Sequence, residues 1–447
     1  MSTGRFIYKL VDNRLLRRSL CVDVHNDAGR DRRWSTREVT SLAKWDTTDK
    51  EKVAEPAREQ AEQAISSKPP SAERLVSLDT FRGFIMFWII GGDALFAALS
   101  SWLHNPVLNL VAYETHHTPW IGLRFYDCIW PSFMLMVGVS IPFSLAKRSL
   151  TESDRDFRLH TLSRAIVLFL LGSVRESVLL GSPYLIELSS ALQPIAIAYF
   201  VAAMMARKSP RVQATVAAVI LAAYALLLAL VPAPGIPAGT YVLNHNLVNA
   251  VDLHFLRPHW DRWPYAFEGW GTILSTIPTV STTLSGLIVG ELLRSNRSRQ
   301  KKAQMIGGLG ILLLILGFGL SPIIPIEMKM WTTTYGLASA GCACLMFLLF
   351  HWFVDIRGYR KWTLFFVVIG MNPIFIYMAT SILPIDKLVG VFTNGIAGHL
   401  GTAGPAFNAL WVFVVEWAVL FWMYRRRIFI KAQAVDELLK VNHNGFH

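Results

Sequence analysis

Five ionisable side chains lie in or beside the first two apolar segments of the chain: Asp79, Arg82, Asp93, His117 and Asp127. An ionisable group at the centre of a membrane helix costs about 2.5 to 3.5 kcal/mol on insertion scales. Side chains at such positions need a functional reason, and this set combines acids, a base and a cation. The combination indicates proton-transfer chemistry.

His117 is the candidate general base, because histidine exchanges protons near neutral pH. It could equally act as a nucleophile that forms a transient covalent intermediate. Asp127 is the right residue type to orient the ring, set its tautomer and stabilise the imidazolium. The sequence leaves the base and nucleophile routes open.

The elements that carry these residues are apolar segments long enough to cross a bilayer, which takes about 20 helical residues. They recur to the end of the chain and predict an all-α, polytopic membrane protein with about ten transmembrane helices. The hydrophobic content of 53% and the mean hydropathy of +0.39 agree with this class. The predicted spans are 79–100, 125–146, 161–180, 188–206, 212–232, 271–293, 304–321, 332–354, 363–384 and 405–424.

The connections between these spans alternate in charge. Lys and Arg gather in 147–164, 207–211, 294–302, 357–361 and 425–427, whereas the other connections hold few cations. By the positive-inside rule the first set is cytoplasmic, and both termini are then cytoplasmic.

This orientation separates the ionisable residues into two clusters. Asp79 and Arg82 fall near the cytoplasmic face. Asp93 lies about 21 Å further along the same helix, at ~1.5 Å per residue. It is therefore expected on the far side, together with His117.

Three regions follow from composition. Residues 1–70 are polar and mixed in charge, which predicts a disordered cytoplasmic extension without a signal peptide. Residues 71–430 form the membrane domain, and 431–447 form a cytoplasmic tail. The net charge of +12 does not indicate nucleic-acid binding, because the cations sit in short clusters between apolar runs. The four cysteines follow no metal-ligand spacing, so we expect no metal.

The longest predicted extracytoplasmic connection, 233–270, is rich in His, Trp and Asn. Aromatic and polar residues mixed in this way suit a carbohydrate-like ligand; an interfacial aromatic belt with a capping loop is the alternative. Glu268, Arg175 and Glu176 fall on the same half of the membrane as this connection. Arg175 and Glu176 could instead pair with each other.

Several short motifs occur in order across 72–425. They are R-L-x-S-x-D-x-x-R-G at 74–83, H-x-x-W-x-G-x-x-x-x-D at 117–127 followed by W-P-x-F at 130–133, E-G at 268–269 with L-S-T-I at 274–277, W-T-T-x-Y at 331–335, D-x-R-G at 355–358 and G-M-N-P at 370–373. Each motif is weak alone. In this order they resemble the heparan-α-glucosaminide N-acetyltransferase family, a group of transmembrane acyltransferases.

The resemblance implies acetyl transfer from cytoplasmic acetyl-coenzyme A to an amino or hydroxyl group on the far side of the membrane. The acceptor would be a small molecule, glycan or amino sugar. His117 takes the position of the family's catalytic histidine, Asp127 that of its acid and Asp93 that of a further polar site residue. The family also contains dimers, which makes a homodimer an expectation here.

The chain departs from the family at Ala266-Phe267, where many members have Asp-Pro before Glu-Gly. We therefore expect a bacterial relative, in the cytoplasmic (inner) membrane, that acts on an acceptor other than heparan sulfate.

The coenzyme carries phosphates, which call for Arg or Lys. The candidates for its binding are Arg82, Arg124, Asp79 and Asn372. The Asp79–Arg82 pair could instead be structural, and Asn372 could satisfy backbone groups freed by Pro373. Candidates for acceptor binding are Trp120, Glu268, Arg175 and Glu176.

Two other functional classes fit the composition. A transporter of a sugar or lipid precursor would use the same buried charges, and a non-catalytic membrane scaffold would need none of them. The H-x-x-W-x-G-x-x-x-x-D block favours the acyltransferase, because a transporter does not need a His–Asp pair in a tight extracytoplasmic link.

Overall fold

The computed structural model describes residues 75–148, 153–181, 183, 188, 190–256 and 268–430. All of them belong to one compact unit, Arg74–His447. The predicted extension 1–70 and tail 431–447 lie outside the described residues.

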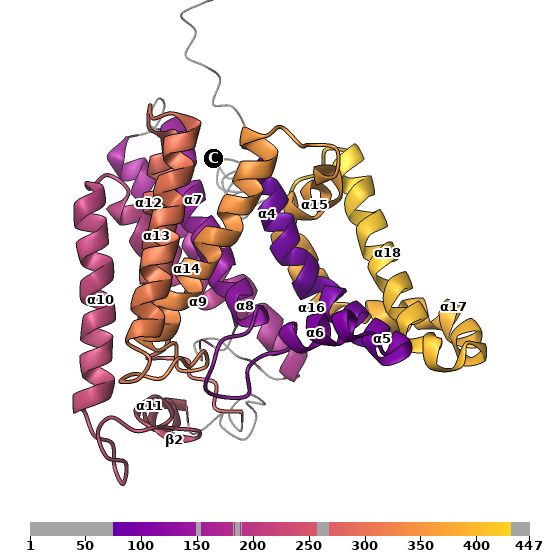
Figure 1. Ribbon diagram of the computed structural model, residues 1–447, viewed down its shortest axis with the longest axis horizontal. Helices are drawn as coiled ribbons and strands as arrows, with labels where there is room; N and C mark the ends of the chain where they lie inside the picture. Colours follow the sequence, from indigo (N-terminus) through magenta and orange to yellow (C-terminus); the bar gives the residue numbers. More distant parts are fainter. Residues whose placement is uncertain are drawn as a thin grey trace, which may run out of the picture. The chain divides into compact units, whose positions relative to one another are not determined.

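The described residues are mostly helical, as predicted for an all-α protein (Figure 1). The α-helices are α4 Val76–Phe87, α5 Asp93–Leu103, α6 Pro106–Glu114, α7 Ile129–Arg148, α8 Asp154–Leu180, α9 Leu192–Met205, α10 Pro210–Leu230, α11 Leu247–Leu256, α12 Thr276–Arg294, α13 Arg299–Gly319, α14 Thr333–Phe350, α15 Thr363–Gly370, α16 Pro373–Ile382, α17 Ile385–His399 and α18 Gly404–Arg425. Two π-helices, η2 Trp88–Gly92 and η5 His351–Ile356, extend α4 and α14, and two 3₁₀ turns, η3 Tyr126–Cys128 and η6 Gly401–Ala403, precede α7 and α18. β1 Tyr241–Val242 and β2 His245–Asn246 form one small antiparallel pair.

The membrane character of the chain is confirmed. Among the described residues seven helical segments are long and apolar enough to cross a bilayer: Val76–Leu103, Tyr126–Ala146, Pro210–Leu230, Thr276–Arg294, Arg299–Gly319, Thr333–Ile356 and Gly401–Arg425. Helices α15 and α16 together make an eighth such segment, bent by 72°. Each matches a predicted span.

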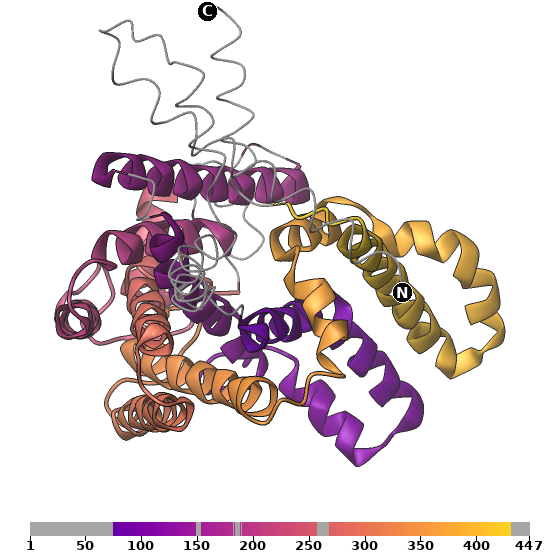
Figure 2. The ribbon, with the colours of Figure 1, turned by 90° about the horizontal axis from the view of Figure 1, so that it is seen from above.

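The two remaining predicted spans, 161–180 and 188–206, correspond to α8 and α9. Helix α8 carries Arg164, Arg175 and Glu176 in its apolar half, and α9 has only 14 residues. Seen from above in Figure 2, α8 lies side-on along one edge of the bundle rather than end-on.

Helices α7 and α12 meet backbone to backbone at small residues. A β-carbon on Gly286 would lie 2.1 Å from the carbonyl oxygen of Leu135, and one on Gly290 would lie 2.5 Å from that of Val139. In the same way, a β-carbon on Gly138 would lie 2.0 Å from the carbonyl oxygen of Thr283 on α12. In lipid, where burial of apolar area does not drive association, such close contact is a main source of helix pairing.

The broken span pairs with the first helix in the same way. A β-carbon on Gly370 would lie 2.1 Å from the carbonyl oxygen of Asp79, and one on Gly83 would meet the carbonyl of Phe366. The break follows at Asn372, because Pro373 begins α16 and has no N–H to continue the helical ladder. Helix α4 is thereby held against the bend.

Serine N-caps begin three helices that follow cation-rich connections: Ser153 for α8, Ser209 for α10 and Ser298 for α13. Thr332 caps α14 where it leaves the connection after α13. Helices α10 and α12 pack against each other, and α11 and β2 lie at the lower end of the view in Figure 1.

Candidate active site

The first span is broken beside Asp93. Helix α4 passes through the π-helix η2, where Gly91 adopts φ 133°, and α5 begins at Asp93. A residue with a side chain rarely takes this conformation, so glycine makes the break possible. The Asp93 carboxylate accepts hydrogen bonds from the Ala94 amide at 2.7 Å and the Tyr126 hydroxyl at 3.3 Å. Single-turn π-segments of this kind recur at functional sites.

His117 and Asp127 form a hydrogen-bonded pair. The imidazole Nδ1 lies 2.9 Å from Oδ1 of Asp127. The His117 side chain is 38% exposed, whereas that of Asp127 is fully buried. A buried carboxylate is an acceptor when ionised, so the proton of neutral His117 resides on Nδ1 and Nε2 keeps its lone pair. Contact between these two residues, which the sequence left open, is therefore present in the structure.

Three further donors converge on the Asp127 carboxylate. The Thr118 hydroxyl lies 2.6 Å from Oδ2 and the Arg124 amide 2.9 Å from it, while the Thr118 amide donates at 3.3 Å to Oδ1. These bonds close the loop 117–127 around the acid. They offset the cost of burying its charge and fix the direction in which it meets His117.

Distant elements hold this loop in place. The Tyr335 hydroxyl of α14 donates to the carbonyl of Asp127 at 2.7 Å, and the Gly122 amide donates to the carbonyl of Ile326 at 2.9 Å. The Trp120 indole donates to the Tyr241 carbonyl at 2.8 Å. Trp120, predicted to bind the acceptor, thus ties the His117 loop to the β1–β2 hairpin.

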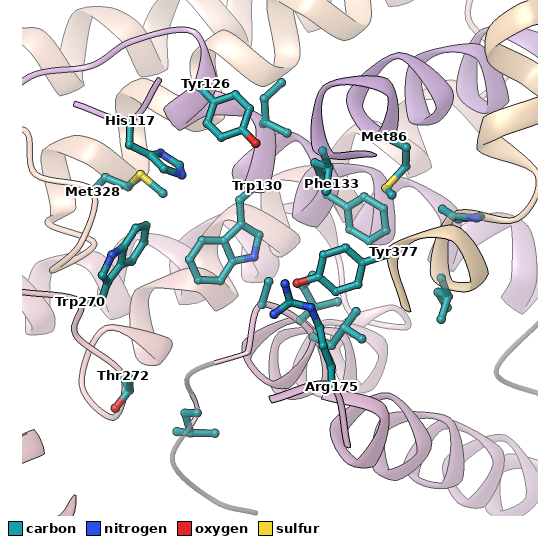
Figure 3. A pocket seen from close by; sticks show the side chains of 18 of the residues that line it. Met86, His117, Tyr126, Trp130, Phe133, Arg175, Trp270, Thr272, Met328 and Tyr377 are labelled. Carbon is teal, nitrogen blue, oxygen red and sulfur yellow. The ribbon is translucent and has the colours of Figure 1, made fainter. Parts of the chain in front are cut away.

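A cavity of about 290 Å³ opens beside the pair. His117, Tyr126, Trp130, Trp270, Arg175 and Tyr377 are among the residues that line it, together with apolar side chains of α4, α7, α9 and α16. Figure 3 shows His117 and Trp270 on one side of this space and Arg175 with Tyr377 on the other, with Trp130 between them. Of the residues predicted from sequence, His117 and Arg175 line the cavity.

Two aromatic rings pack against the imidazole. Tyr126 meets it edge-on at 4.8 Å between centroids, and Trp270 meets it at 5.4 Å. Glu268, predicted for the acceptor, is exposed; its carboxylate accepts the Trp270 indole N–H at 3.0 Å. The Lys329 ammonium lies 5.4 Å from the centre of the Trp270 ring and donates to the Glu268 carbonyl at 2.7 Å. Glu268 thus acts on the site through Trp270.

Arg175 and Glu176 form an ion pair at the opposite wall. The Arg175 guanidinium also donates to Ser381 at 2.8 Å and lies 4.7 Å above the Tyr377 ring. Glu176 is buried. Arg175 and Glu176 therefore pair with each other, which was one of the two possibilities considered from the sequence. Arg175 also faces the cavity.

Asp79 and Arg82 lie in a cluster of their own. Their side chains are 3.4 Å apart, and Arg82 also donates to Ser140 on α7 at 3.0 Å. In the π-helix η5, Asp355 accepts hydrogen bonds from Ser77 and His351. The second π-helix therefore coincides with the second group of ionisable residues.

Arg124 and Asn372, both predicted for the coenzyme, make bonds that hold the chain in place. Arg124 donates to the His117 carbonyl at 3.1 Å and lies 3.9 Å above the Tyr113 ring. Asn372 is buried, and its amide exchanges hydrogen bonds of 2.9 Å with the backbone of Ile428 and Ile430. Neither side chain lines the cavity.

Glu327 is a buried acid behind the site that the sequence did not single out. It accepts hydrogen bonds from the amides of Lys329 and Met330, and Ile121 pairs with its backbone. Burial raises the pKa of the Glu327 carboxyl to about 8. A single acid in a connecting segment carries no motif, so only its surroundings reveal it.

Asp252 on α11 ties this helix to the segment just before α12. Its carboxylate accepts the amides of Thr272 at 2.8 Å and Ile273 at 3.0 Å. Burial raises the pKa of this carboxyl to about 6, against the opposing effect of these bonds. The described part of the predicted ligand-binding loop therefore packs as a cover beside the cavity.

Among the described residues no group of three or more His, Cys, Asp or Glu side chains is placed to hold a metal ion. No protein-family model matches the chain, and no curated protein matches it.

Proposed function

We propose that the protein is a membrane-embedded acyltransferase. It moves an acetyl group from cytoplasmic acetyl-coenzyme A to an amino or hydroxyl group of an extracytoplasmic acceptor, a glycan or amino sugar. In this proposal the chain has about ten spans, keeps both termini in the cytoplasm and resides in a bacterial inner membrane, with a homodimer as the assembly. The motif resemblance and the His117 site support it together.

One observation carries the proposal: the imidazole of His117 has Nδ1 bound to the buried Asp127 at 2.9 Å while its ring lines a cavity. This arrangement leaves Nε2 as the acceptor of a proton. An oriented base beside a mostly apolar space suits transfer from a thioester, because the base takes the proton of the acceptor while the apolar walls surround the acyl group.

In the base route, Nε2 of His117 takes a proton from the acceptor amine or hydroxyl as its nitrogen or oxygen attacks the acetyl carbon. The carbon–sulfur bond then breaks, and the departing thiolate receives the proton from the imidazolium. Asp127 stabilises that imidazolium through Nδ1. In the nucleophile route, Nε2 itself attacks the carbonyl carbon, the carbon–sulfur bond breaks and the coenzyme leaves as its thiolate. The acceptor then gives its proton to that thiolate and attacks the acetyl-imidazole, and the acetyl–nitrogen bond breaks to restore free His117.

The walls of the cavity suit the acyl end of the donor. Most lining side chains are apolar, and a volume of about 290 Å³ exceeds what an acetyl group fills. The aromatic ring of Trp270, beside His117, offers a surface on which a sugar ring would stack. Arg82 and Arg124 do not line this space, so neither is assigned a role at the acyl group.

A transporter is the second candidate, and one observation favours it. The α15–α16 pair is broken and bent by 72°, and broken helices form the binding sites of many transporters. Pro373 and Tyr377 of this pair line the same cavity as His117. The acyltransferase and the transporter therefore predict different results when the same variants are assayed.

The test uses purified full-length protein, radiolabelled acetyl-coenzyme A and a panel of amino sugars. His117→Ala is compared with wild type. The matched control is His116→Ala, which removes the neighbouring exposed histidine whose ring contacts the Ala112 carbonyl. We expect His117→Ala to lose activity by at least about 10²-fold, the usual contribution of a positioned base.

Turnover by wild type and His116→Ala but not by His117→Ala supports the acyltransferase. Label retained on the wild-type protein favours the acetyl-imidazole route. If no form binds the coenzyme or transfers label, the acyltransferase is refuted, and sugar uptake into proteoliposomes then tests the transporter.

A further inference from the structure

The cavity contains a buried hydrogen-bond donor without a partner. Within the part of the chain that the structure describes, no hydrogen-bond partner lies near the indole nitrogen of Trp130, although this atom is buried. An indole N–H can only donate. Leaving a buried donor unsatisfied costs about 1 to 3 kcal/mol, and such groups in native proteins call for an explanation.

The position of Trp130 in the cavity wall indicates where the missing partner would bind. It lies one helical turn after Tyr126, so both side chains project from the same face at the start of α7. Both line the cavity with His117. Figure 3 shows Trp130 in the cavity wall, between His117 on one side and Arg175 with Tyr377 on the other. The indole nitrogen itself has almost no accessible surface, so a ligand atom reaches it only when neighbouring side chains move aside.

The surroundings select the chemistry of a ligand that this donor would meet. The neighbouring walls include Ile129, Phe133 and Met328, which offer no strong hydrogen-bonding groups from their side chains. Polar groups of Tyr126, Arg175 and Tyr377 also line the cavity, so the indole N–H is one of several donors there. Among the apolar side chains it matches a part of a ligand that is apolar except for one acceptor. The carbonyl of an acyl thioester has this character.

The donor is held rigidly. The Trp130 ring packs edge-on against Trp331 at 4.8 Å between centroids, and Trp331 is itself buried and packed against Tyr335 at 5.2 Å. A donor fixed before the reaction costs no reorganisation when charge develops on an oxygen. This is the property required of a group that stabilises an oxyanion.

We propose that the Trp130 indole N–H binds the carbonyl oxygen of the acyl thioester and stabilises the negative charge that develops there. This inference rests on the proposed function. As the acceptor or the Nε2 atom of His117 attacks the carbon, the carbonyl π electrons move to the oxygen. When the carbonyl re-forms, the carbon–sulfur bond breaks and the thiolate leaves.

The test is Trp130→Phe, which keeps an aromatic ring and removes the N–H. We expect kcat for acetyl transfer to fall about 10²- to 10³-fold, as for the loss of one oxyanion donor, with KM for acetyl-coenzyme A changed only a few-fold. The matched control is Trp88→Phe. The Trp88 indole nitrogen is also buried without a partner among the described residues, but it does not line the cavity, so its kcat should stay within about threefold.

A spectroscopic measurement separates binding of the oxygen from a packing effect. The carba analogue of acetyl-coenzyme A, with a methylene in place of the sulfur, keeps the carbonyl and cannot transfer it. Its isotope-labelled C=O stretch should shift to lower frequency on binding to wild type and lose that shift in Trp130→Phe. If the phenylalanine variant does not fold, 3-benzothienylalanine at position 130 replaces only the N–H by sulfur and serves in both assays.

The outcomes distinguish the two proposals. Turnover by Trp130→Phe within threefold of wild type, or an unchanged C=O stretch, overturns the role of Trp130 and leaves the acyltransferase intact. Absence of both turnover and carba-analogue binding in wild type overturns both.

Discussion

Replacing Asp127 by Asn should invert the tautomer of His117 without disturbing the fold. The Oδ2 atom of Asp127 accepts the Arg124 amide at 2.9 Å and the Thr118 hydroxyl at 2.6 Å, while Oδ1 faces Nδ1 of His117 at 2.9 Å. The Arg124 amide can only donate, so an asparagine must present its oxygen there. Its NH₂ group then points at Nδ1, and the imidazole proton moves to Nε2.

The magnitude follows from the bonds involved. A ring protonated at Nε2 cannot accept a proton from the acceptor. To react, it must return to the other tautomer, which places the Nδ1–H against the asparagine NH₂ and leaves two buried donors facing each other. At about 1 to 3 kcal/mol for each of the two unsatisfied donors, the barrier rises by roughly 2 to 6 kcal/mol. Since about 1.4 kcal/mol is tenfold in rate, kcat should fall by about 30-fold to about 10⁴-fold.

The assay is acetyl transfer by Asp127→Asn, with kcat and KM measured separately. KM should change little, because Asp127 does not line the cavity. Asp154→Asn is the control: this acid is exposed and pairs with Arg207, away from the His117 loop. Thermal unfolding is measured on both variants, to show that each remains folded.

A folded Asp127→Asn protein with kcat within about threefold of wild type would refute the orienting role of Asp127. If His117→Ala were inactive in the same experiment, His117 would remain catalytic but would not depend on the tautomer argued here.

Two further predictions concern stability. Gly286→Ala should destabilise the folded protein by several kcal/mol, because its β-carbon would lie 2.1 Å from a backbone oxygen of α7, whereas Gly308→Ala, in open space on α13, should be neutral or slightly stabilising. Equal melting temperatures for the two alanine variants would contradict the backbone-to-backbone packing of α7 and α12. Burial raises the pKa of Glu327 to about 8 from an ordinary value of 4.5. Between these two pH values the native state binds more protons than the unfolded state. The free energy of unfolding should therefore fall as the pH rises through this window. The melting temperature should therefore decrease from pH 6 to pH 9 in wild type, as measured by scanning fluorimetry, and Glu327→Gln should flatten the decrease; parallel curves for the two proteins would show that Glu327 is not its source.

The spans could be read from sequence because hydropathy is a local property. The predicted segment 212–232 became α10, Pro210–Leu230, and 304–321 became α13, Arg299–Gly319. The bend within 363–384 was harder to foresee. Its cause, Pro373, is visible in the sequence, but the angle depends on the contact of Gly370 with the backbone of α4.

His117 and Asp127 were selected from sequence because they lie in the H-x-x-W-x-G-x-x-x-x-D block that carries the resemblance. Trp130 and Trp270 were not selected as site residues. An aromatic residue in an apolar segment usually has a packing role. Trp130 differs from such residues because it lines a cavity and its indole N–H has no partner among the described residues.

Sequence by itself determined the class of this protein and most of its helical segments, because composition and periodicity act along the chain. It placed His117 and Asp127 in one short motif, but the contact between them came from the structure. The tertiary structure decided which side chains share a space. Tyr335 reaches Asp127 across 208 positions and Trp120 reaches Tyr241 across 121, and such contacts exist only after the helices have packed. The cavity and its unsatisfied donor result from that packing, because they depend on which apolar walls meet.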